Sequence, residues 1–356
     1  MTAAYLNRIA TAAPENDVHL AFIEFAGEML KDQRSRALFR RMAERSGIAH
    51  RFSCLQPENQ PSSFSVPAGD FYTRGNFPGT GRRMELFESA APPLARCALD
   101  RLRITQEERK RISHILVTCC TGLNAPGIDF AAIDHLGLSS SVERTVIGFM
   151  GCYAAMNALK LARHIVRSEP GALVLIVNLE LCTLHFQETQ ELEQVLSFLL
   201  FGDGCAACLV SSEPRGFQLD SFRTFILPGT SDLITWTIRD KGFDMWLSGK
   251  VPNQIGKSIG GVWEQCGGGR PAGTIPLWAV HPGGRTILDA VGQGLALPEP
   301  LMQPSRKILE GFGNMSSATI MFVLRELMQL AQSGEQGCAL AFGPGLTAET
   351  LLFHAV

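Results

Sequence analysis

The sequence predicts an α/β fold made of two similar halves. The chain has 356 residues, which is enough for two fused units that share a core. Short apolar runs typical of strands alternate with segments whose apolar residues recur at helical spacing, and this alternation occurs in both parts of the chain. The pattern restarts near residues 211–216. We therefore predict an N-terminal half, residues 1–212, and a C-terminal half, residues 213–356.

The composition is that of an ordinary enzyme. Charged residues make up 19% and hydrophobic residues 46% of the chain, and the formal net charge is −2, which gives no general attraction to nucleic acid. Ten cysteines without a charged and then apolar leader favour a reduced, cytoplasmic protein over a disulfide-stabilised secreted one. No apolar run approaches ~18 residues, so we expect no membrane span.

Residues 18–45 are predicted to form a helix with a basic second half. Apolar residues recur there at helical spacing, and the second half of the segment also contains five arginines. Arg41 and Arg45 are four residues apart and share a face that could hold phosphate groups. The alternative is a solvated helix face.

The rest of the N-terminal half alternates between strands and helices. Residues 57–81 are rich in Pro, Ser and Gly and are predicted to be irregular. The run Leu-Val-Leu-Ile-Val within residues 171–183 indicates a parallel strand buried on both faces. The other predicted segments are helices at 84–102, 127–136, 154–162 and 188–200, and strands at 112–119 and 205–210.

The C-terminal half repeats these ingredients. Strands alternate with helices there as in the first half. The strands are expected at residues 276–280, 338–342 and 350–354, and the helices at residues 286–291 and 317–331.

Cys152 is the strongest candidate for a nucleophile. A strand-like run ends in a turn that contains Gly148 and Gly151, and Cys152 then precedes the helix predicted at 154–162. A helix N-terminus stabilises a thiolate, so we expect a lowered pKa for this thiol. The alternative is a cysteine that is merely packed. A tight turn between a strand and a helix exposes a nucleophile at a sheet edge, which favours the first interpretation.

His281 and Asn314 are candidate partners of this cysteine. His281 ends an apolar strand and precedes a Pro-Gly-Gly turn, where a side chain can face a cavity. Asn314 lies in a glycine turn just before a helix, where the alternative role is a helix N-cap. An imidazole can hold a thiolate, and the cysteine can carry an acyl group as a thioester. Histidine and asparagine can donate to the enolate oxygen that forms when a malonyl thioester loses its carboxylate.

Other cysteines give weaker signals. Cys205 and Cys208 have redox spacing, but they lie in an apolar strand that places their thiols on opposite faces, so we expect core packing. Cys119 and Cys120 end a predicted strand. They either pack in the core or point toward the same cavity as Cys152.

Five sequence blocks, in the same order, make the chain resemble a bacterial-type type III polyketide synthase, in the chalcone-synthase-like branch of the thiolase superfamily. The resemblance extends from about residue 36 to the C-terminus. It implies the layered αβαβα thiolase fold, a homodimer, and a buried cavity reached by a pantetheine tunnel. The blocks are residues 148–155, 201–204, 281–284, 313–317 and 342–345.

The resemblance also implies the residue roles. Cys152 becomes the acyl-carrying nucleophile, while His281 and Asn314 decarboxylate malonyl-CoA and stabilise the enolate. CoA thioesters are the substrates, and no cofactor or metal is implied. Arg41 and Arg45 match two of the family's three basic CoA-phosphate contacts, and the third corresponds to Leu38 here. The CoA-contacting residues implied by the resemblance are Arg41, Arg45, Gly283 and Gly284.

Departures from plant members concern the cavity. Met245 replaces a second gatekeeper phenylalanine and is flexible, so it could admit a longer acyl chain. Trp236 replaces a glycine and narrows one wall, and Ala125 replaces a methionine that reaches into the partner subunit. We hypothesise a fatty or medium-chain acyl-CoA starter, extended by malonyl-CoA to an alkylpyrone, a resorcinol or a related aromatic product. The implied cavity residues are Phe201, Met245, Cys120, Cys182, His185, Trp236 and Ser316.

Three rival classes remain open. A ketoacyl synthase that begins fatty acid synthesis also uses Cys, His and Asn, but Gln-Ala-Asn usually follows its histidine, where this chain has Pro282-Gly283-Gly284. A thiolase needs a second catalytic cysteine, and the candidate, Cys338, begins a predicted strand. A catalytically silent thiolase-fold module is the third, and the intact cysteine, histidine and asparagine disfavour it.

Overall fold

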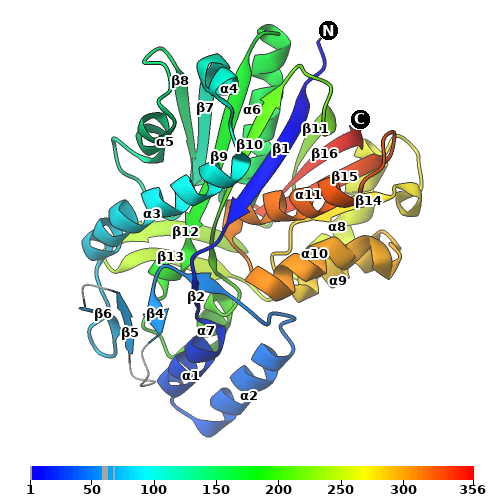
Figure 1. Ribbon diagram of the computed structural model, residues 1–356. Coiled ribbons are helices and arrows are strands. Elements are labelled where there is room, and N and C mark those ends of the chain that lie inside the picture. Colours follow the sequence, from blue (N-terminus) through cyan, green and yellow to red (C-terminus); the bar gives the residue numbers. More distant parts are fainter. Residues whose placement is uncertain (1, 58–62, 67–68) are drawn as a thin grey trace.

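One large sheet joins both halves of the chain (Figure 1). The computed structural model describes residues 2–57, 63–66 and 69–356, and within these residues nine strands are ordered β14-β15-β16-β11-β1-β10-β9-β7-β8. The strands are β1 (Tyr5–Ala12), β7 (Ile112–Cys119), β8 (Glu143–Gly148), β9 (Leu173–Leu181), β10 (Asp203–Ser211), β11 (Phe217–Ile226), β14 (Leu277–Val280), β15 (Gln336–Gly343) and β16 (Thr347–Ala355).

The sheet is mixed. β7 runs parallel to β8 and β9, and β14 runs parallel to β15, whereas β9 and β10 pair in antiparallel fashion. The expectation of a parallel sheet therefore holds for β7, β8 and β9 and for the pair β14–β15, and it is wrong for the other strand pairs, which are antiparallel. The apolar run of β9 indicates that both faces of the strand are buried. Burial on both faces does not fix the direction of the neighbouring strands, because helices cover both faces of this sheet.

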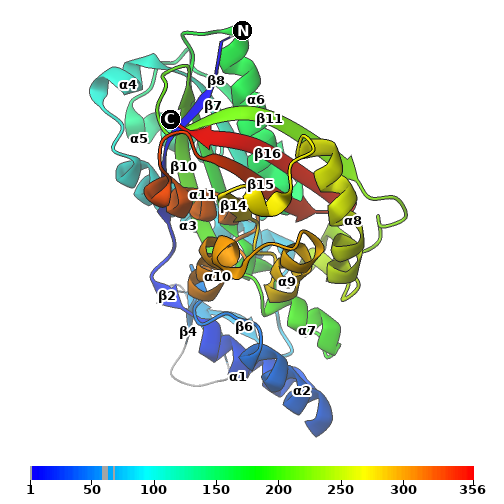
Figure 2. The same cartoon turned by 90° about the vertical axis from the view of Figure 1, so that its right-hand side faces the viewer.

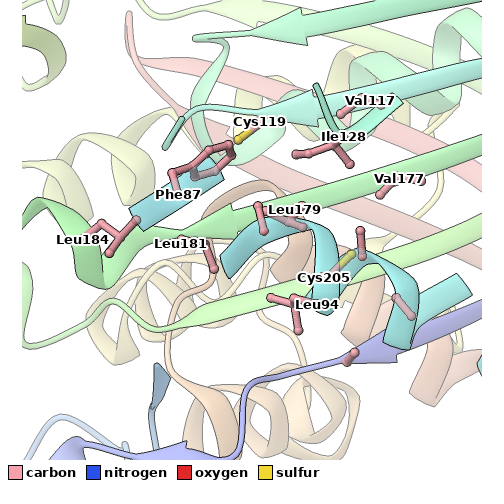
Figure 3. Packing of buried hydrophobic residues seen from close by; sticks show 14 of the residues in the cluster. Phe87, Leu94, Val117, Cys119, Ile128, Val177, Leu179, Leu181, Leu184 and Cys205 are labelled. Carbon is pink, nitrogen blue, oxygen red and sulfur yellow. The ribbon is translucent and has the colours of Figure 1, made fainter. Parts of the chain in front are cut away.

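Three apolar clusters separate the layers. The first lies between β7, β9, β10 and the helices α3 (Thr80–Leu102) and α5 (Ile128–Leu136), and Figure 3 shows part of it. The second surrounds the central helices α6 (Ala154–Ser168) and α11 (Thr319–Leu330), which both halves of the sheet contact. The third lies under α8 (Val251–Cys266), α9 (Arg285–Gly294) and α10 (Glu299–Phe312).

The strands alternate between these clusters, as the two-residue period of a strand requires. In β14, Ala279 packs in the second cluster and its neighbour Trp278 packs in the third. In β10, Cys205 packs in the first cluster and Cys208 in the second. The layered αβαβα prediction is confirmed, and so is the core position of these two cysteines.

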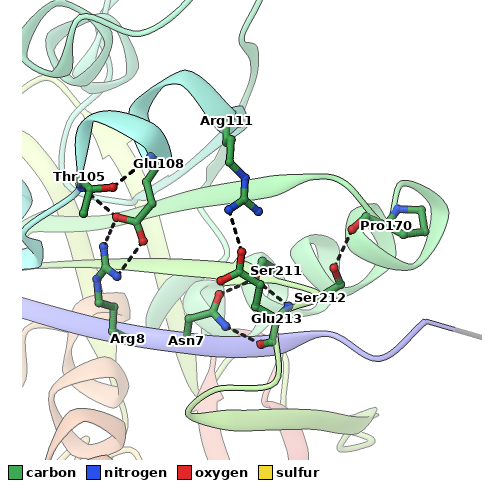
Figure 4. A network of polar contacts seen from close by, with 9 residues as sticks. All are labelled: Asn7, Arg8, Thr105, Glu108, Arg111, Pro170, Ser211, Ser212 and Glu213. Atoms are coloured by element: carbon green, nitrogen blue, oxygen red, sulfur yellow. Dashed lines mark hydrogen bonds and ion pairs between the residues drawn. The ribbon is translucent and has the colours of Figure 1, made fainter.

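β1 joins the two halves of the sheet, and the sequence analysis missed it. It pairs with β10 on one side and with β11 on the other. Polar contacts fix its first residues (Figure 4). The Arg8 guanidinium donates to both oxygens of Glu108, and the Asn7 amide donates to the carbonyl oxygen of Glu213. The strand mixes small apolar residues with polar ones, so its sequence has no clear apolar run and was not predicted as a strand.

The predicted helix at 18–45 is two helices, α1 (His19–Met29) and α2 (Gln33–Glu44). Asp32 ends the continuity because its carboxylate accepts from the Ser35 backbone N–H at 2.8 Å and so caps α2. Both helices lie below the layered body (Figure 2). Short strands β2 (Asn16–Asp17) and β3 (Phe52–Ser53) form a pair on the same side of the layered body.

Residues predicted to be irregular include a small sheet of β4 (Gln56–Pro57), β5 (Ser63–Val66) and β6 (Gly69–Thr73). The part of that prediction at 58–62 and 67–68 falls outside the described residues. A second unpredicted feature is the hairpin of β12 (Ile234–Arg239) and β13 (Gly242–Leu247). The remaining helices are α4 (Gln106–Arg111) and α7 (Leu192–Phe198).

No helix in the described part of the chain combines the length and the apolarity that crossing a bilayer requires. All ten cysteines fall within the described residues, and none forms a disulfide.

Candidate active site

Cys152, His281 and Asn314 line one cavity between the two halves. The Cys152 Sγ lies 4.0 Å from the Asn314 Oδ1. The cavity holds about 760 Å³ of space free of protein atoms, counting its open mouth.

Backbone strain places Cys152 at this cavity. After β8, Phe149 and Gly151 both adopt positive φ angles, of 56° and 74°. A Cβ at position 151 would lie 2.4 Å from the Cδ of Pro344, so only glycine fits there. Cys152 then lies in a 3₁₀ turn, Gly151–Tyr153, that leads into α6. The predicted position before a helix is therefore observed.

The expected lowering of the Cys152 pKa is wrong. Burial raises the pKa of this thiol to about 11, and the carboxyl of Glu180 adds to the rise, whereas hydrogen bonds with the side chains of Ser316 and Asn314 act in the opposite direction. Burial in apolar surroundings outweighs the turn N-terminus here. The resting thiol is therefore protonated at neutral pH, and its attack on a carbonyl requires a base.

His281 presents an unpaired ring to the cavity. Its backbone N–H donates to the Leu340 carbonyl at 2.7 Å, which fixes the residue at the end of β14. The side chain is buried, and neither ring nitrogen has a partner within the described residues. Burial lowers the pKa of His281 to about 3, so the ring is neutral at pH 7. A neutral imidazole offers a bound molecule one donor and one acceptor.

Asn314 is held by the backbone of the neighbouring segment. Its N–H donates to the Leu200 carbonyl at 2.8 Å, and its own carbonyl accepts from the N–H of Gly202 at 3.0 Å. Its side-chain Oδ1 accepts from the Ser316 N–H at 2.9 Å. Asn314 thus forms a local turn and lines the cavity, whereas Met315 is the N-cap of the short helix that follows.

Most of the predicted wall residues line the cavity. Trp236 does so from the β12–β13 hairpin, and its indole N–H donates to the Cys120 carbonyl at 2.7 Å. The backbone N–H of Gly151 donates to the Cys120 Sγ at 3.1 Å, so this cysteine lies beside the nucleophile turn. The predicted residues found in the wall are Phe201, Met245, Cys120, Cys182, Trp236, Ser316 and Gly283.

His185 was predicted to line the cavity, but it lies behind the cavity wall. Its Nε2 bonds with the Thr121 carbonyl at 2.7 Å, its Nδ1 accepts from the Phe243 N–H, and its ring stacks on that of Phe243 at 4.3 Å. Both ring nitrogens are thus used inside the protein. His185 supports the hairpin and the residue next to Cys120.

The residues expected to contact CoA lie apart from the wall, except for Gly283. Arg41 and Arg45 are exposed at the C-terminal end of α2, as is Leu38 one turn earlier. Gly284 is the N-cap of α9 and packs near Leu200.

Glu180 is the polar residue that the sequence analysis missed. It is fully buried on β9, where its Oε2 accepts from the Cys120 N–H at 2.9 Å and the Thr121 hydroxyl at 2.8 Å. Its Oε1 accepts from the Ser317 hydroxyl at 2.6 Å. Burial raises its pKa to about 7. The sequence contained one signal for this residue, a single acidic side chain within an otherwise largely apolar strand.

The sequence analysis also missed further wall residues, because separate elements bring them together. They come from the β12–β13 hairpin, from α7 and α9, and from β15 and the residue after it: Ile234, Thr235, Leu247, Phe198, Ile287, Phe342 and Pro344.

Comparisons with known proteins show the family of the chain. The family model described as "Chalcone and stilbene synthases, N-terminal domain" matches residues 3–214, and the corresponding C-terminal domain matches residues 218–356. The chain is 33% identical over 376 residues to "Alpha-pyrone synthesis polyketide synthase-like Pks18" of Mycobacterium tuberculosis and Mycobacterium bovis. That alignment covers 100% of this chain and 92% of the relative.

Solved structures share the architecture. PKS-I from the brown alga Ectocarpus siliculosus is 29% identical with a TM-score of 0.88, and the match covers 100% of this chain and 99% of that one. The C-terminal type III polyketide synthase domain of Steely1 from Dictyostelium also has a TM-score of 0.88, over 99% of both chains. At 22% identity, that second likeness concerns the fold alone.

Proposed function

The chain belongs to the chalcone and stilbene synthase family and is a type III polyketide synthase, and from this premise we propose that it extends an aliphatic acyl-CoA with malonyl-CoA and releases an alkyl-α-pyrone. The observation that carries the proposal is that Cys152, His281 and Asn314 line one mainly apolar cavity. The α-pyrone product is supported by the relative whose name includes that activity.

Loading of the starter uses Cys152 and His281. The sulfur of Cys152 attacks the thioester carbonyl of acyl-CoA, a new carbon–sulfur bond forms, and the bond to the CoA sulfur breaks. The unpaired His281 ring takes the proton from the thiol and passes it to the departing CoA sulfur. Its neutral state leaves a lone pair free for this transfer.

Extension uses His281 and Asn314 as donors. Malonyl-CoA loses carbon dioxide, and the electron pair of the broken bond moves to the thioester oxygen of the resulting enolate. The His281 N–H and the Asn314 amide stabilise that oxygen, and the apolar wall strengthens both interactions. The enolate carbon then attacks the acyl group on Cys152, the bond from the carbonyl carbon to the sulfur breaks, and the sulfur leaves as a thiolate that takes a proton from water. The chain, two carbons longer, is now on CoA and can be loaded again.

Release closes the ring. The enol oxygen of the third carbonyl attacks the terminal thioester carbonyl, a carbon–oxygen bond forms, and CoA leaves with the enol proton. The resulting lactone is the α-pyrone. An aldol closure would give a resorcinol instead, and the experiment below separates the two.

CoA binding and assembly complete the proposal. We place the CoA phosphates near Arg41 and Arg45, whose guanidinium groups are exposed on one side of α2. We also propose a homodimer, because the edge strand β8 carries the half-exposed Val146, and Leu123 and Met150 nearby are 47% and 37% exposed. Ala125, also exposed, lies in the same region of the chain.

The test is a product analysis. The purified protein is incubated with malonyl-CoA and acyl-CoA starters of four to sixteen carbons, and the products are identified by mass and fragmentation. We expect triketide or tetraketide pyrones whose mass follows the starter. Products with the mass of resorcinols, which lack the carbon lost as carbon dioxide, would show that the ring closes by aldol condensation and not as a lactone. The absence of any polyketide from all starters would refute the proposal.

A further inference from the structure

An open cleft lies over β1, between the C-terminal end of α3 and the helix α11 (Figure 1). We call it the β1 cleft. The space that a water molecule can enter there measures about 770 Å³, and ligand pockets typically measure roughly 300–1,000 Å³. Among the described residues, none lines both this cleft and the catalytic cavity. The β1 cleft is therefore a separate site, which the proposed chemistry does not use.

Positive charge gathers in the β1 cleft. No aspartate or glutamate of the described residues lines it. Arg8 is neutralised, because its guanidinium donates to both oxygens of Glu108 at 2.8 and 2.5 Å (Figure 4). The other four arginines form no ion pair within the described part of the chain. The arginines that line the cleft come from β1, α3, the β10–β11 loop and α11, and are Arg8, Arg101, Arg103, Arg215 and Arg325.

Thr11 brings two of these cations together from opposite walls. The Nη1 of Arg101, on α3, donates to the Thr11 carbonyl oxygen at 2.9 Å. The Nη1 of Arg325, on α11, donates to the Thr11 hydroxyl at 3.3 Å. Two guanidinium groups thus meet over one residue of β1. Like charges at this separation repel each other, and an anion bound between them would turn that repulsion into attraction.

The remaining two arginines are free to bind a ligand. Arg103 follows α3 and Arg215 lies in the β10–β11 loop, and both residues are exposed. Neither guanidinium has a hydrogen-bond partner among the described residues, since only the backbone carbonyls of these two residues accept bonds. The cleft also has an aromatic part, where the rings of Phe312 and Phe322 meet edge to face with centres 5.0 Å apart.

We propose that the β1 cleft binds a small molecule that carries two or more linked phosphate groups. Each guanidinium can donate two parallel hydrogen bonds to phosphate oxygens. Linked phosphates place several negative charges within a short distance, which matches four uncompensated arginines in one cleft. Nucleic acid is disfavoured, because it needs a basic stripe open along its length, whereas α3 and α11 wall this cleft on two sides. Inorganic polyphosphate and nucleoside polyphosphates share the required chemistry.

The experiment is titration calorimetry of the purified full chain with tripolyphosphate and, separately, with ATP, both without divalent cations. Arg103→Glu and Arg215→Glu are made one at a time, since neither side chain holds the fold through a hydrogen bond. We expect each variant to bind both probes at least tenfold more weakly, because a charge-assisted bond is replaced by repulsion. Tighter binding of ATP than of tripolyphosphate identifies a nucleoside polyphosphate, and equal binding identifies the phosphate chain alone as the recognised group.

Two control variants locate the binding. Arg96→Glu makes the same change of charge at an exposed position of α3 that does not line the cleft, and its affinity should equal that of the wild type. Arg41→Glu tests the surface proposed for CoA, and it should also leave tripolyphosphate binding unchanged. Should Arg103→Glu or Arg215→Glu fail to fold, Arg103→Gln and Arg215→Gln remove the charge without reversing it and should lower the affinity in the same direction.

Three results would overturn the proposal. The first is a wild type that binds neither probe. The second is an equal loss of affinity in Arg96→Glu, which would show a general effect of net charge. The third is a loss confined to Arg41→Glu, which would place the phosphates on α2 and leave the β1 cleft without a ligand.

Discussion

Replacing Glu180 with glutamine should make the stability of the protein less sensitive to pH. Glutamine has the shape of the protonated acid. Its oxygen can accept from the Cys120 N–H and the Thr121 hydroxyl, as the Glu180 Oε2 does. Its amide can donate to the Ser317 hydroxyl, which can turn its own proton toward the Thr118 hydroxyl, 3.0 Å away. The substitution therefore removes the charge and keeps the hydrogen bonds.

The magnitude follows from the pKa of Glu180. Burial raises it from the ordinary 4.5 to about 7. The unfolded chain loses this proton near pH 4.5, whereas the folded chain keeps it to about pH 7. Between these values the folded state binds one more proton, so the stability falls as pH rises and levels off above pH 7. A shift of this size corresponds to about 3 kcal/mol at 1.36 kcal/mol per pH unit.

The assay is urea unfolding of wild type and Glu180→Gln at pH 5 and pH 8, at one protein concentration. From pH 5 to pH 8, the free energy of unfolding of the wild type should fall by about 2.5 kcal/mol relative to that of the variant, because the unfolded chain has already lost most of this proton at pH 5. Asp203, whose pKa burial raises to about 6, is present in both proteins and cancels. A difference that is equal at both pH values would show that Glu180 is ionised throughout, and would refute this reasoning.

Three further substitutions test the catalytic cavity. Cys152→Ala should abolish the mass increase on incubation with acyl-CoA, and a persisting increase would place the acyl group on another residue. His281→Gln should retain some loading but lower the rate of carbon dioxide release from malonyl-CoA by about 10²–10³-fold, the scale for one lost donor; an undiminished rate would exclude this role. Met245→Phe should shorten the longest accepted starter in the product mass profile, and an unchanged profile would show that this side chain does not limit the cavity.

Much of the layered core could be predicted from the sequence. β7 was predicted with its observed ends, Ile112–Cys119, because a buried strand between clear turns has a strong apolar pattern. β1 and the β12–β13 hairpin were missed, since small and polar residues weaken the pattern and long-range pairing decides their state. The apolar pattern also could not predict strand direction, since β9 pairs in parallel with β7 and in antiparallel fashion with β10.

The site divides in the same way. Cys152, His281 and Asn314 could be found because turn residues surround each of them, and the structure brings all three to one cavity. The sign of the Cys152 pKa shift was wrong, because burial by distant segments outweighs the local turn. The orientation of His185 depends on Thr121 and Phe243, which no local pattern connects to it.

The pairing of β1 has a consequence for biosynthesis. This strand leaves the ribosome early, yet one neighbour, β10, ends at Ser211 and the other, β11, begins only at Phe217. Its two edges have no partner until most of the N-terminal half has been translated, and loop closure over such a separation is slow. Deleting Tyr5–Ala12 would leave β10 and β11 with open edges in the middle of the molecule, and nascent chains lacking these eight residues should aggregate.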